Sequence, residues 1–219
     1  MNKLISLLSI ATLCGLFACD QVKVPSPAPS FYDCTAFSGD SSAQHPKAQQ
    51  FEEILSTHQP GNLVGGVLLA IDERGMWQGA AGLASIELQA QMATCHRFLI
   101  ASISKVFSAV LAHALVDEGV WQLDDPIRGY LSADTVAKID NAEAVSIRQL
   151  LDHTAGIADY YTIQYELDRF NQIDNRWTQE DVLGYIMGKK ATHAPGETYA
   201  YSNGNYLLLG ILLERATGQ

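Results

Sequence analysis

The sequence contains one clear pair of β-strand signals, and every later periodic segment is helical. Residues 64–71 and 76–83 are rich in β-forming side chains and flank the acidic turn 72–75, which ends in glycine. This arrangement is typical of a β-hairpin. Because an isolated hairpin is only marginally stable in water, the two strands need a helix or further strands to cover them. The order of signals predicts an α+β fold with a large helical part.

Apolar spacing and capping residues predict several helices around this hairpin. The expected helices lie at 47–58, 102–118, from the Asp125-Pro126 pair onward, 146–151, 178–188 and 203–217. Gly119 and Gly218 are the expected stops after two of them. Thr178 and Asp181 form a sequence pattern similar to a capping box.

Composition excludes two classes of protein. Hydrophobic residues make up 47% of the chain and charged residues 17%, which favours a packed core over a disordered chain. With 14 Lys+Arg against 24 Asp+Glu, the formal net charge is −10. Nucleic-acid binding needs a basic surface, so we expect no nucleic-acid partner.

The first residues have the layout of an export signal. Lys3 precedes a short apolar run at 4–17, which predicts a secretory signal peptide over 1–18. The sequence Leu16-Phe17-Ala18-Cys19 resembles a bacterial lipobox, although a small residue is usual where Phe17 stands. We therefore expect lipidation at Cys19, with a plain signal peptide cut nearby as the alternative. Either way, the protein is expected in the periplasm or cell envelope, and a lipid on Cys19 would anchor it to a membrane.

Residues 19–46 are predicted to link this anchor to the folded domain, which is expected over 47–219. Prolines at alternate positions in 25–29 favour extended, semi-rigid polyproline geometry. Cys34 and Cys95 remain after the signal and the lipid site are set aside. In an oxidising compartment they form a candidate disulfide, and two buried free thiols are the alternative.

Ser102-Ile103-Ser104-Lys105 fits the pattern Ser-x-x-Lys at the start of an apolar helix. Residues three apart on a helix share a face, with Cβ atoms about 5–6 Å apart. A serine hydroxyl is a weak nucleophile until a neighbouring base takes its proton, and Lys105 is placed to do this or to polarise a second base. The alternative is a surface serine beside a solvated lysine.

Tyr201-Ser202-Asn203 is the second candidate element. A tyrosine beside a lysine loses its proton more easily, because the cation favours the phenolate, and it can then serve as general base and later as general acid. Asn203 can both donate and accept, so it can bind a lysine or a substrate amide. The alternative is an aromatic anchor followed by a helix cap.

His153, in Leu-Leu-Asp-His-Thr-Ala-Gly, invites a catalytic interpretation as the partner of Ser102. We favour a packed turn residue instead. The other histidines show no metal-ligand spacing, and no phosphate-binding glycine motif is present, so neither a metal nor another cofactor is expected.

Together, Ser102-x-x-Lys105, the Leu-Leu-x-His-Thr-x-Gly turn and Pro-Gly-x-x-x-x-Tyr-Ser-Asn closely resemble the serine β-lactamase-related family. That family includes class C β-lactamases, D-alanyl-D-alanine carboxypeptidases and esterases. The resemblance implies a helical subdomain beside an antiparallel sheet. It also implies that Ser102 is acylated, that Lys105 is its partner, that Tyr201 shuttles the proton, and that Asn203 binds Lys105 and a substrate amide.

The family's third motif, Lys-Thr-Gly or His-x-Gly on a later strand, has no counterpart after Asn203. We therefore expect the N-terminal part of a longer protein, lacking the C-terminal strands and inactive by itself. The function implied is a serine hydrolase that acts on β-lactams, D-Ala-D-Ala peptides or small esters. The alternative is an inactive fragment or pseudoenzyme that binds peptidoglycan-like ligands or a partner.

Overall fold

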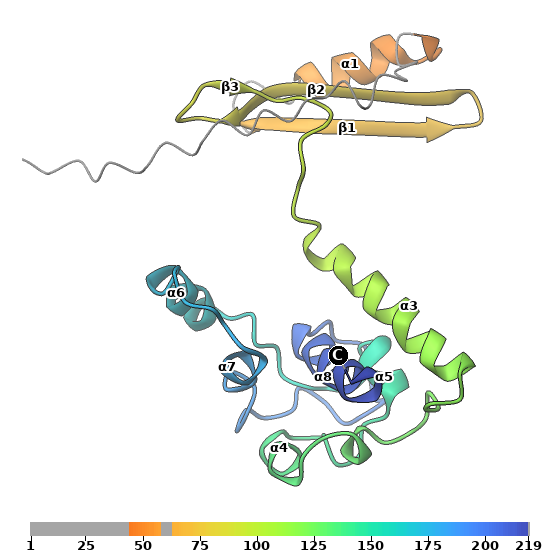
Figure 1. Cartoon of the computed structure of the whole chain (residues 1–219), viewed down its shortest axis with the longest axis vertical. Helices are drawn as coiled ribbons and strands as arrows, with labels where there is room; N and C mark the ends of the chain where they lie inside the picture. Colours follow the sequence, from red (N-terminus) through yellow and green to blue (C-terminus); the bar gives the residue numbers. More distant parts are fainter. Residues whose placement is uncertain (1–43, 58–62, 219) are drawn as a thin grey trace, which may run out of the picture. The chain divides into compact units, whose positions relative to one another are not determined.

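The computed structural model describes residues 44–57 and 63–218, which form two compact units divided between Phe98 and Leu99 (Figure 1). The predictions for the signal peptide, for Cys19, for Cys34 and for most of the linker lie outside the described residues. No described helix is both long enough and apolar enough to cross a membrane.

The first unit is a helix on a small antiparallel sheet (Figure 1). Its elements in chain order are α1 (Ala48–Thr57), β1 (Gly65–Asp72), β2 (Gly75–Ser85) and β3 (Ala90–Gln91). Strands β1 and β2 pair in continuous register from Gly65 opposite Gly82 to Asp72 opposite Gly75, so the structure confirms the predicted hairpin. The two-residue β3, which the sequence did not suggest, extends the sheet to the order β1-β2-β3.

One side chain of β2 dominates the small core of this unit. Trp77 is 3% exposed, and its ring centroid lies 5.4 Å from that of Phe51 on α1. A Cβ at Gly79 would come within 2.4 Å of the Trp77 ring, so any larger residue there would force the indole to move. Leu69 and Ile71 on β1 are 55% and 70% exposed, so part of the hairpin stays uncovered in the described residues.

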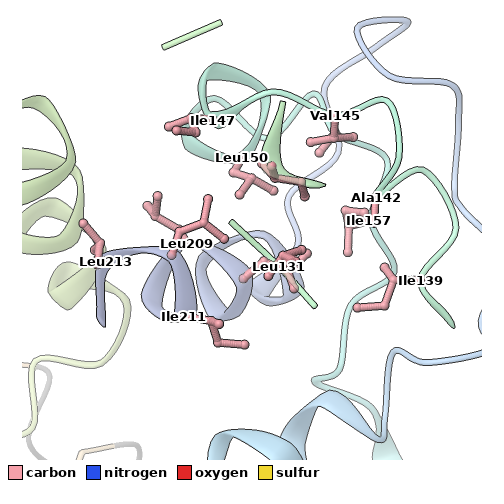
Figure 2. Packing of buried hydrophobic residues seen from close by; sticks show 14 of the residues in the cluster. Leu131, Ile139, Ala142, Val145, Ile147, Leu150, Ile157, Leu209, Ile211 and Leu213 are labelled. Atoms are coloured by element: carbon pink, nitrogen blue, oxygen red, sulfur yellow. The ribbon is translucent and has the colours of Figure 1, made fainter. Parts of the chain in front are cut away.

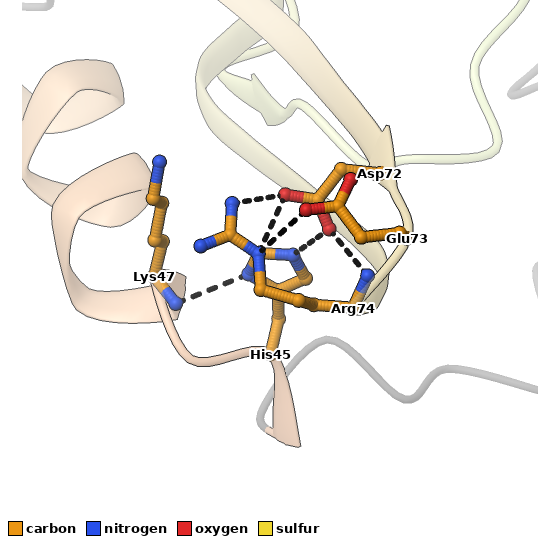
Figure 3. A network of polar contacts seen from close by, with 5 residues as sticks. All are labelled: His45, Lys47, Asp72, Glu73 and Arg74. Carbon is orange, nitrogen blue, oxygen red and sulfur yellow. Dashed lines mark hydrogen bonds and ion pairs between the residues drawn. The ribbon is translucent and has the colours of Figure 1, made fainter.

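The hairpin turn is tied to the residues before α1 by a polar network (Figure 3). The Asp72 carboxylate accepts hydrogen bonds from the Arg74 backbone at 2.8 Å, from the Arg74 guanidinium and from His45 Nε2 at 3.1 Å. The Lys47 amide donates to His45 Nδ1, which leaves Nε2 as the nitrogen that donates to Asp72. The Arg74 side chain, its backbone amide and His45 together hold the pKa of Asp72 far below its usual range.

The second unit is helical. Its elements are the 3-10 turn η3 (Ala101–Ile103), α3 (Ser104–Asp117), the 3-10 turn η4 (Ile127–Gly129), α4 (Ala133–Lys138), α5 (Ile147–Leu151), α6 (Ile163–Asn171), α7 (Gln179–Leu183) and α8 (Asn203–Thr217). Helix α8 packs against α3, α5 and α7. Leu208, Leu209 and Leu212 on α8 are fully buried. Figure 2 shows Leu209 in the same cluster as Ile147 and Leu150, which α5 supplies.

The predicted helix ends agree with the structure at several points. Ser146 caps α5 and forms a capping box with Gln149, and Thr178 forms one with Asp181 at the start of α7. Helix α8 spans 203–217, and Gly218 follows it with a φ of 71°. The predicted helix at 102–118 begins instead as η3, so Ser102 lies in a 3-10 turn that leads into α3.

Two predicted helices are wrong in extent. Asp125 does not cap a helix, because Pro126 is extended and forms a bridge with Ser146 before the short turn η4. The Asp125 carboxylate instead accepts hydrogen bonds from the Gln122 amide and the Tyr130 hydroxyl. Helix α7 ends at 183 rather than 188, and tight turns follow it.

Helices α4 and α6 were not anticipated. Ser132 and Thr162 cap them by accepting hydrogen bonds from the amides three residues on. Serine and threonine at these places were the available signals, since both are preferred N-cap residues.

Candidate active site

Ser102 lies in η3, directly before α3, on an exposed part of the helical unit. The residue before it, Ala101, has a φ of 45°, a left-handed conformation that non-glycine residues rarely adopt. This turn places Ser102 ahead of the first turn of α3 and keeps Lys105 on the same side. Lys105 Nζ lies 3.2 Å from Ser102 Oγ and donates to it.

Tyr201 and Asn203 reach the same place from the start of α8. The Tyr201 hydroxyl lies 2.9 Å from Ser102 Oγ, and Lys105 Nζ donates to Asn203 Oδ1 at 2.8 Å. Lys105 Nζ also lies 5.1 Å from the centre of the Tyr201 ring. The structure therefore brings together all four side chains that the sequence singled out for chemistry.

The N-terminus of α8 is held by hydrogen bonds to the segment that follows α5. Ser202 is the N-cap: its hydroxyl accepts from the Gly204 amide at 3.0 Å and donates to the Ala158 carbonyl at 3.1 Å. Because these bonds fix the backbone on either side of Ser202, they set where Tyr201 and Asn203 project.

The surroundings of Tyr201 favour its ionised form. Partial burial alone would raise the pKa of the phenol, but hydrogen bonds with Lys105 and Ser102 and the positive charge of Lys105 outweigh it. The pKa of Tyr201 is therefore lowered from its ordinary value of 10.0. A phenol of this kind, 2.9 Å from a serine hydroxyl, is suited to accept its proton.

Sequence reasoning missed Asp159, which lies behind Asn203. Its carboxylate accepts from the Asn203 side-chain amide, with both oxygens 3.2 Å from Nδ2, and from the Asn203 backbone amide at 3.2 Å. The sequence carried no signal for this contact beyond the position of Asp159 shortly after the His-Thr-Ala-Gly turn.

His153 is a packed turn residue, as the sequence favoured. It is 8% exposed and has a φ of 61°. Its Nδ1 lies 3.3 Å from the Ser202 amide and 3.1 Å from Asn205 Nδ2, and its ring packs between Tyr201 and Tyr206. Burial and the charge of Lys105 lower the pKa of His153, which favours the neutral imidazole at the start of α8.

Two further predictions concern sites outside this cluster. Within residues 44–57 and 63–218, no group of three or more histidine, cysteine or acidic side chains is arranged to hold a metal ion. Cys95 takes part in a disulfide. Since Cys34 lies outside the described residues, its pairing with Cys95 stays a prediction.

Comparisons of the sequence with family models and with curated proteins point to the same family. The family model described as Beta-lactamase matches residues 51–219. The chain is 28% identical over 173 residues to protein flp of Staphylococcus aureus strain N315, covering 78% of this chain and 34% of that protein. It is also 28% identical over 170 residues to penicillin-binding protein 4* of Bacillus subtilis strain 168, covering 77% of this chain and 35% of that protein.

Among solved structures, a D-stereospecific amidohydrolase from a Streptomyces species matches with a TM-score of 0.67 and 28% identity. That match covers 80% of this chain and 50% of the amidohydrolase chain. The chain thus spans about a third of the length of the curated relatives it matches and about half of this structural neighbour. Its small antiparallel sheet and its helices have the β-lactamase/DD-peptidase-like fold, and the chain belongs to the beta-lactamase family.

Proposed function

We propose that the complete protein is a serine hydrolase that forms an acyl-enzyme on Ser102. The observation that carries this proposal is the double contact of Ser102 Oγ, which lies 3.2 Å from Lys105 Nζ and 2.9 Å from the Tyr201 hydroxyl. A serine needs a base within hydrogen-bonding distance to become a strong nucleophile, and this one has two candidate groups.

In the proposed reaction, Ser102 Oγ forms a bond to the substrate carbonyl carbon while its proton moves to the Tyr201 oxygen. The resulting tetrahedral species collapses when the carbon–nitrogen or carbon–oxygen bond to the leaving group breaks, and Tyr201 returns the proton to that group. Water then attacks the acyl carbon while its proton moves to the Tyr201 oxygen. The bond between that carbon and Ser102 Oγ breaks, the acid leaves, and Tyr201 returns the proton to Ser102 Oγ. Lys105 stays close enough to stabilise the phenolate form of Tyr201 throughout.

The substrate class we propose is an amide or ester carbonyl compound: a β-lactam, a D-Ala-D-Ala peptide or a small ester. The relatives support this range, since one is a penicillin-binding protein and another is a D-stereospecific amidohydrolase. Asn203 is proposed to contact the substrate amide. We further propose that activity belongs to the complete protein rather than to residues 1–219 alone, because these span about half or less of the length of such relatives.

We also propose that the protein works in the cell envelope, held on a membrane by a lipid at Cys19. The apolar run at 4–17, the Ala18-Cys19 pair and the proline-rich segment after it support this location. An envelope location fits peptidoglycan-like peptides as substrates.

The experiment that tests the activity is covalent labelling of the complete protein with a fluorophosphonate and with a penicillin, followed by mass spectrometry of the labelled peptide. We expect the label on Ser102, and Ser102→Ala should abolish it. Ser108→Ala, which removes a hydroxyl further along α3, is the matched control and should label normally. Labelling that persists in Ser102→Ala would contradict the proposal, and a wild type that binds penicillin without any covalent adduct would favour the non-catalytic alternative.

A further inference from the structure

The side chain of Asn203 is held between two groups with opposite hydrogen-bonding requirements. On one side, both oxygens of the Asp159 carboxylate lie 3.2 Å from Asn203 Nδ2. On the other side, Lys105 Nζ lies 2.8 Å from Asn203 Oδ1. An ionised carboxylate can only accept hydrogen bonds, so it requires the NH₂ group of the amide to face it.

The orientation of this amide decides what Lys105 meets. In the observed orientation, Asn203 presents its carbonyl oxygen to Lys105 Nζ. If the amide turned over, its NH₂ group would face the donating lysine nitrogen, and its oxygen would face the carboxylate oxygens of Asp159. Both contacts would then be repulsive, so the carboxylate of Asp159 selects the orientation in which Lys105 has its acceptor.

Asp159 is itself fixed in place. Its Oδ1 accepts from the Tyr161 amide at 2.9 Å, a local turn that orients the carboxylate, and from the Asn203 backbone amide at 3.2 Å. The neighbouring Ala158 carbonyl accepts from the Ser202 hydroxyl. The segment carrying Asp159 is therefore joined to the start of α8 at two successive residues, and the carboxylate cannot move away from Asn203 without breaking these bonds.

From these contacts we infer that Asp159 is a positioning residue, which fixes the side-chain orientation of Asn203 and thereby keeps Asn203 Oδ1 on Lys105. The inference rests on the proposed function, because its catalytic consequence is the efficiency of Ser102 acylation. Asp159 has no hydrogen bond to Ser102, Lys105 or Tyr201 among its contacts in the described residues. Its charge also acts on the pKa of Tyr201, but more weakly than burial and the contacts with Lys105 and Ser102, so we assign its main effect to Asn203.

A double-mutant cycle in the complete protein separates this role from a general structural one. We expect Asp159→Ala to slow the acylation of Ser102 roughly 10- to 100-fold, as small misplacements of catalytic groups do. If Asp159 acts through Asn203, Asp159→Ala should change the rate less than about threefold when it is added to Asn203→Ala. Losses that multiply in the double variant, or an Asp159→Ala variant as fast as wild type, would overturn the inference.

Two further comparisons complete the test. Asp159→Asn keeps one acceptor oxygen and should restore part of the rate lost in Asp159→Ala. Asp152→Ala removes a carboxylate from the same region, where it contacts Thr154 instead of Asn203, and should acylate at the wild-type rate. A slow Asp152→Ala variant would show that any lost carboxylate in this segment slows the reaction, which would overturn the specific role of Asp159.

A readout that does not need activity distinguishes failure of this inference from failure of the proposed function. Hydrogen exchange of the Asn203 side-chain NH₂, followed by NMR, should be markedly faster in Asp159→Ala and unchanged in Asp152→Ala. Equal exchange in wild type and Asp159→Ala would refute the positioning. If exchange changes as expected while wild-type Ser102 is never acylated, Asp159 orients Asn203 but the proposed reaction is wrong.

Discussion

Lys105 Nζ donates to Asn203 Oδ1 at 2.8 Å, although the two residues lie 98 positions apart in the sequence. This bond joins the start of α3 to the start of α8 and places the lysine beside both Ser102 and Tyr201. The chemistry proposed for the site depends on that convergence.

Replacing Lys105 with methionine should lower the acylation rate of Ser102 on the order of 100-fold or more, the scale of a lost proton-transfer partner. The change keeps most of the length of the side chain but removes its hydrogen bonds to Ser102 and Asn203. Lys190→Met, at a lysine whose side chain is 92% exposed, is the control and should react normally. Second-order labelling rates measure both, and equal rates for Lys105→Met and wild type would rule out a role for the lysine.

Tyr201→Phe should remove the alkaline rise of the acylation rate. The pKa of Tyr201 is lowered from 10.0, so the fraction of phenolate should rise with pH earlier than for an ordinary tyrosine. A base active as phenolate gives a rate that increases as the pH approaches its pKa and then levels off. Labelling rates measured from neutral to alkaline pH test this, with Tyr199→Phe as the control. If the acylation rate of Tyr201→Phe rose with pH as it does in wild type, another group would be the base.

His153→Asn should make the stability of the protein less sensitive to mild acid. Burial and the charge of Lys105 lower the pKa of His153 from 6.5, so below that value the unfolded state takes up a proton more readily than the folded state. The stabilisation is complete at higher pH and is lost as the pH falls through the folded-state pKa. Asparagine tolerates the φ of 61° at this position without titrating.

Thermal melting at neutral and mildly acidic pH measures this effect, and His113→Asn, at an exposed histidine of α3, is the control. The drop in melting temperature on acidification should be smaller in His153→Asn than in wild type or the control. If the melting temperature fell equally in wild type, His153→Asn and His113→Asn, His153 would not contribute to the pH dependence of stability.

Gly204→Ala should destabilise the protein by about 1–3 kcal/mol, the usual cost of forcing an extra methyl group into a packed site. A Cβ at this position would lie 2.3 Å from the Ala158 carbonyl oxygen, so the start of α8 would have to move away from the segment carrying Asp159. Gly210 lies in the same helix and supplies a matched control, because a Cβ there would have open space within 4 Å.

Gly210→Ala should instead leave stability unchanged or raise it by about 0.5–1 kcal/mol, because alanine is the better helix former. Urea unfolding of both variants measures the difference. If Gly204→Ala were as stable as Gly210→Ala, the close approach of α8 to Ala158 would not matter for folding.

Cys19→Ser should release the protein from the membrane or leave the precursor uncut. The lipobox resemblance at 16–19 predicts a lipidated cysteine, and two or more acyl chains suffice for stable anchoring. Partitioning of the complete protein between detergent and aqueous phases measures this, with Cys14→Ser as the control. A wild type found in the aqueous phase would favour the plain signal peptide.

The sequence determined those features that depend on neighbours along the chain. Two runs of β-formers around an acidic turn predicted the β1–β2 hairpin, and caps at Ser146, Thr178 and Gly218 marked helix ends, because these signals act within a few residues. Short elements with weak periodicity, such as α4 and β3, were not predicted. The helix expected from the Asp125-Pro126 pair was wrong, because Pro126 pairs with Ser146 through a bridge that local propensity does not encode.

The residues of the candidate site also fall into those that the sequence predicted and one that only the structure revealed. Ser102 and Lys105 are neighbours on one turn, so the sequence alone placed them together. It also marked Tyr201 and Asn203 as a candidate element, but a family resemblance was needed to join them to Ser102 in one site. Only the tertiary structure decided that Asp159 lies 3.2 Å from Asn203 Nδ2, across 44 residues of chain. Contacts of this kind follow from how the segment after α5 packs on the start of α8, and that packing depends on burial in the shared helical core rather than on any local pattern.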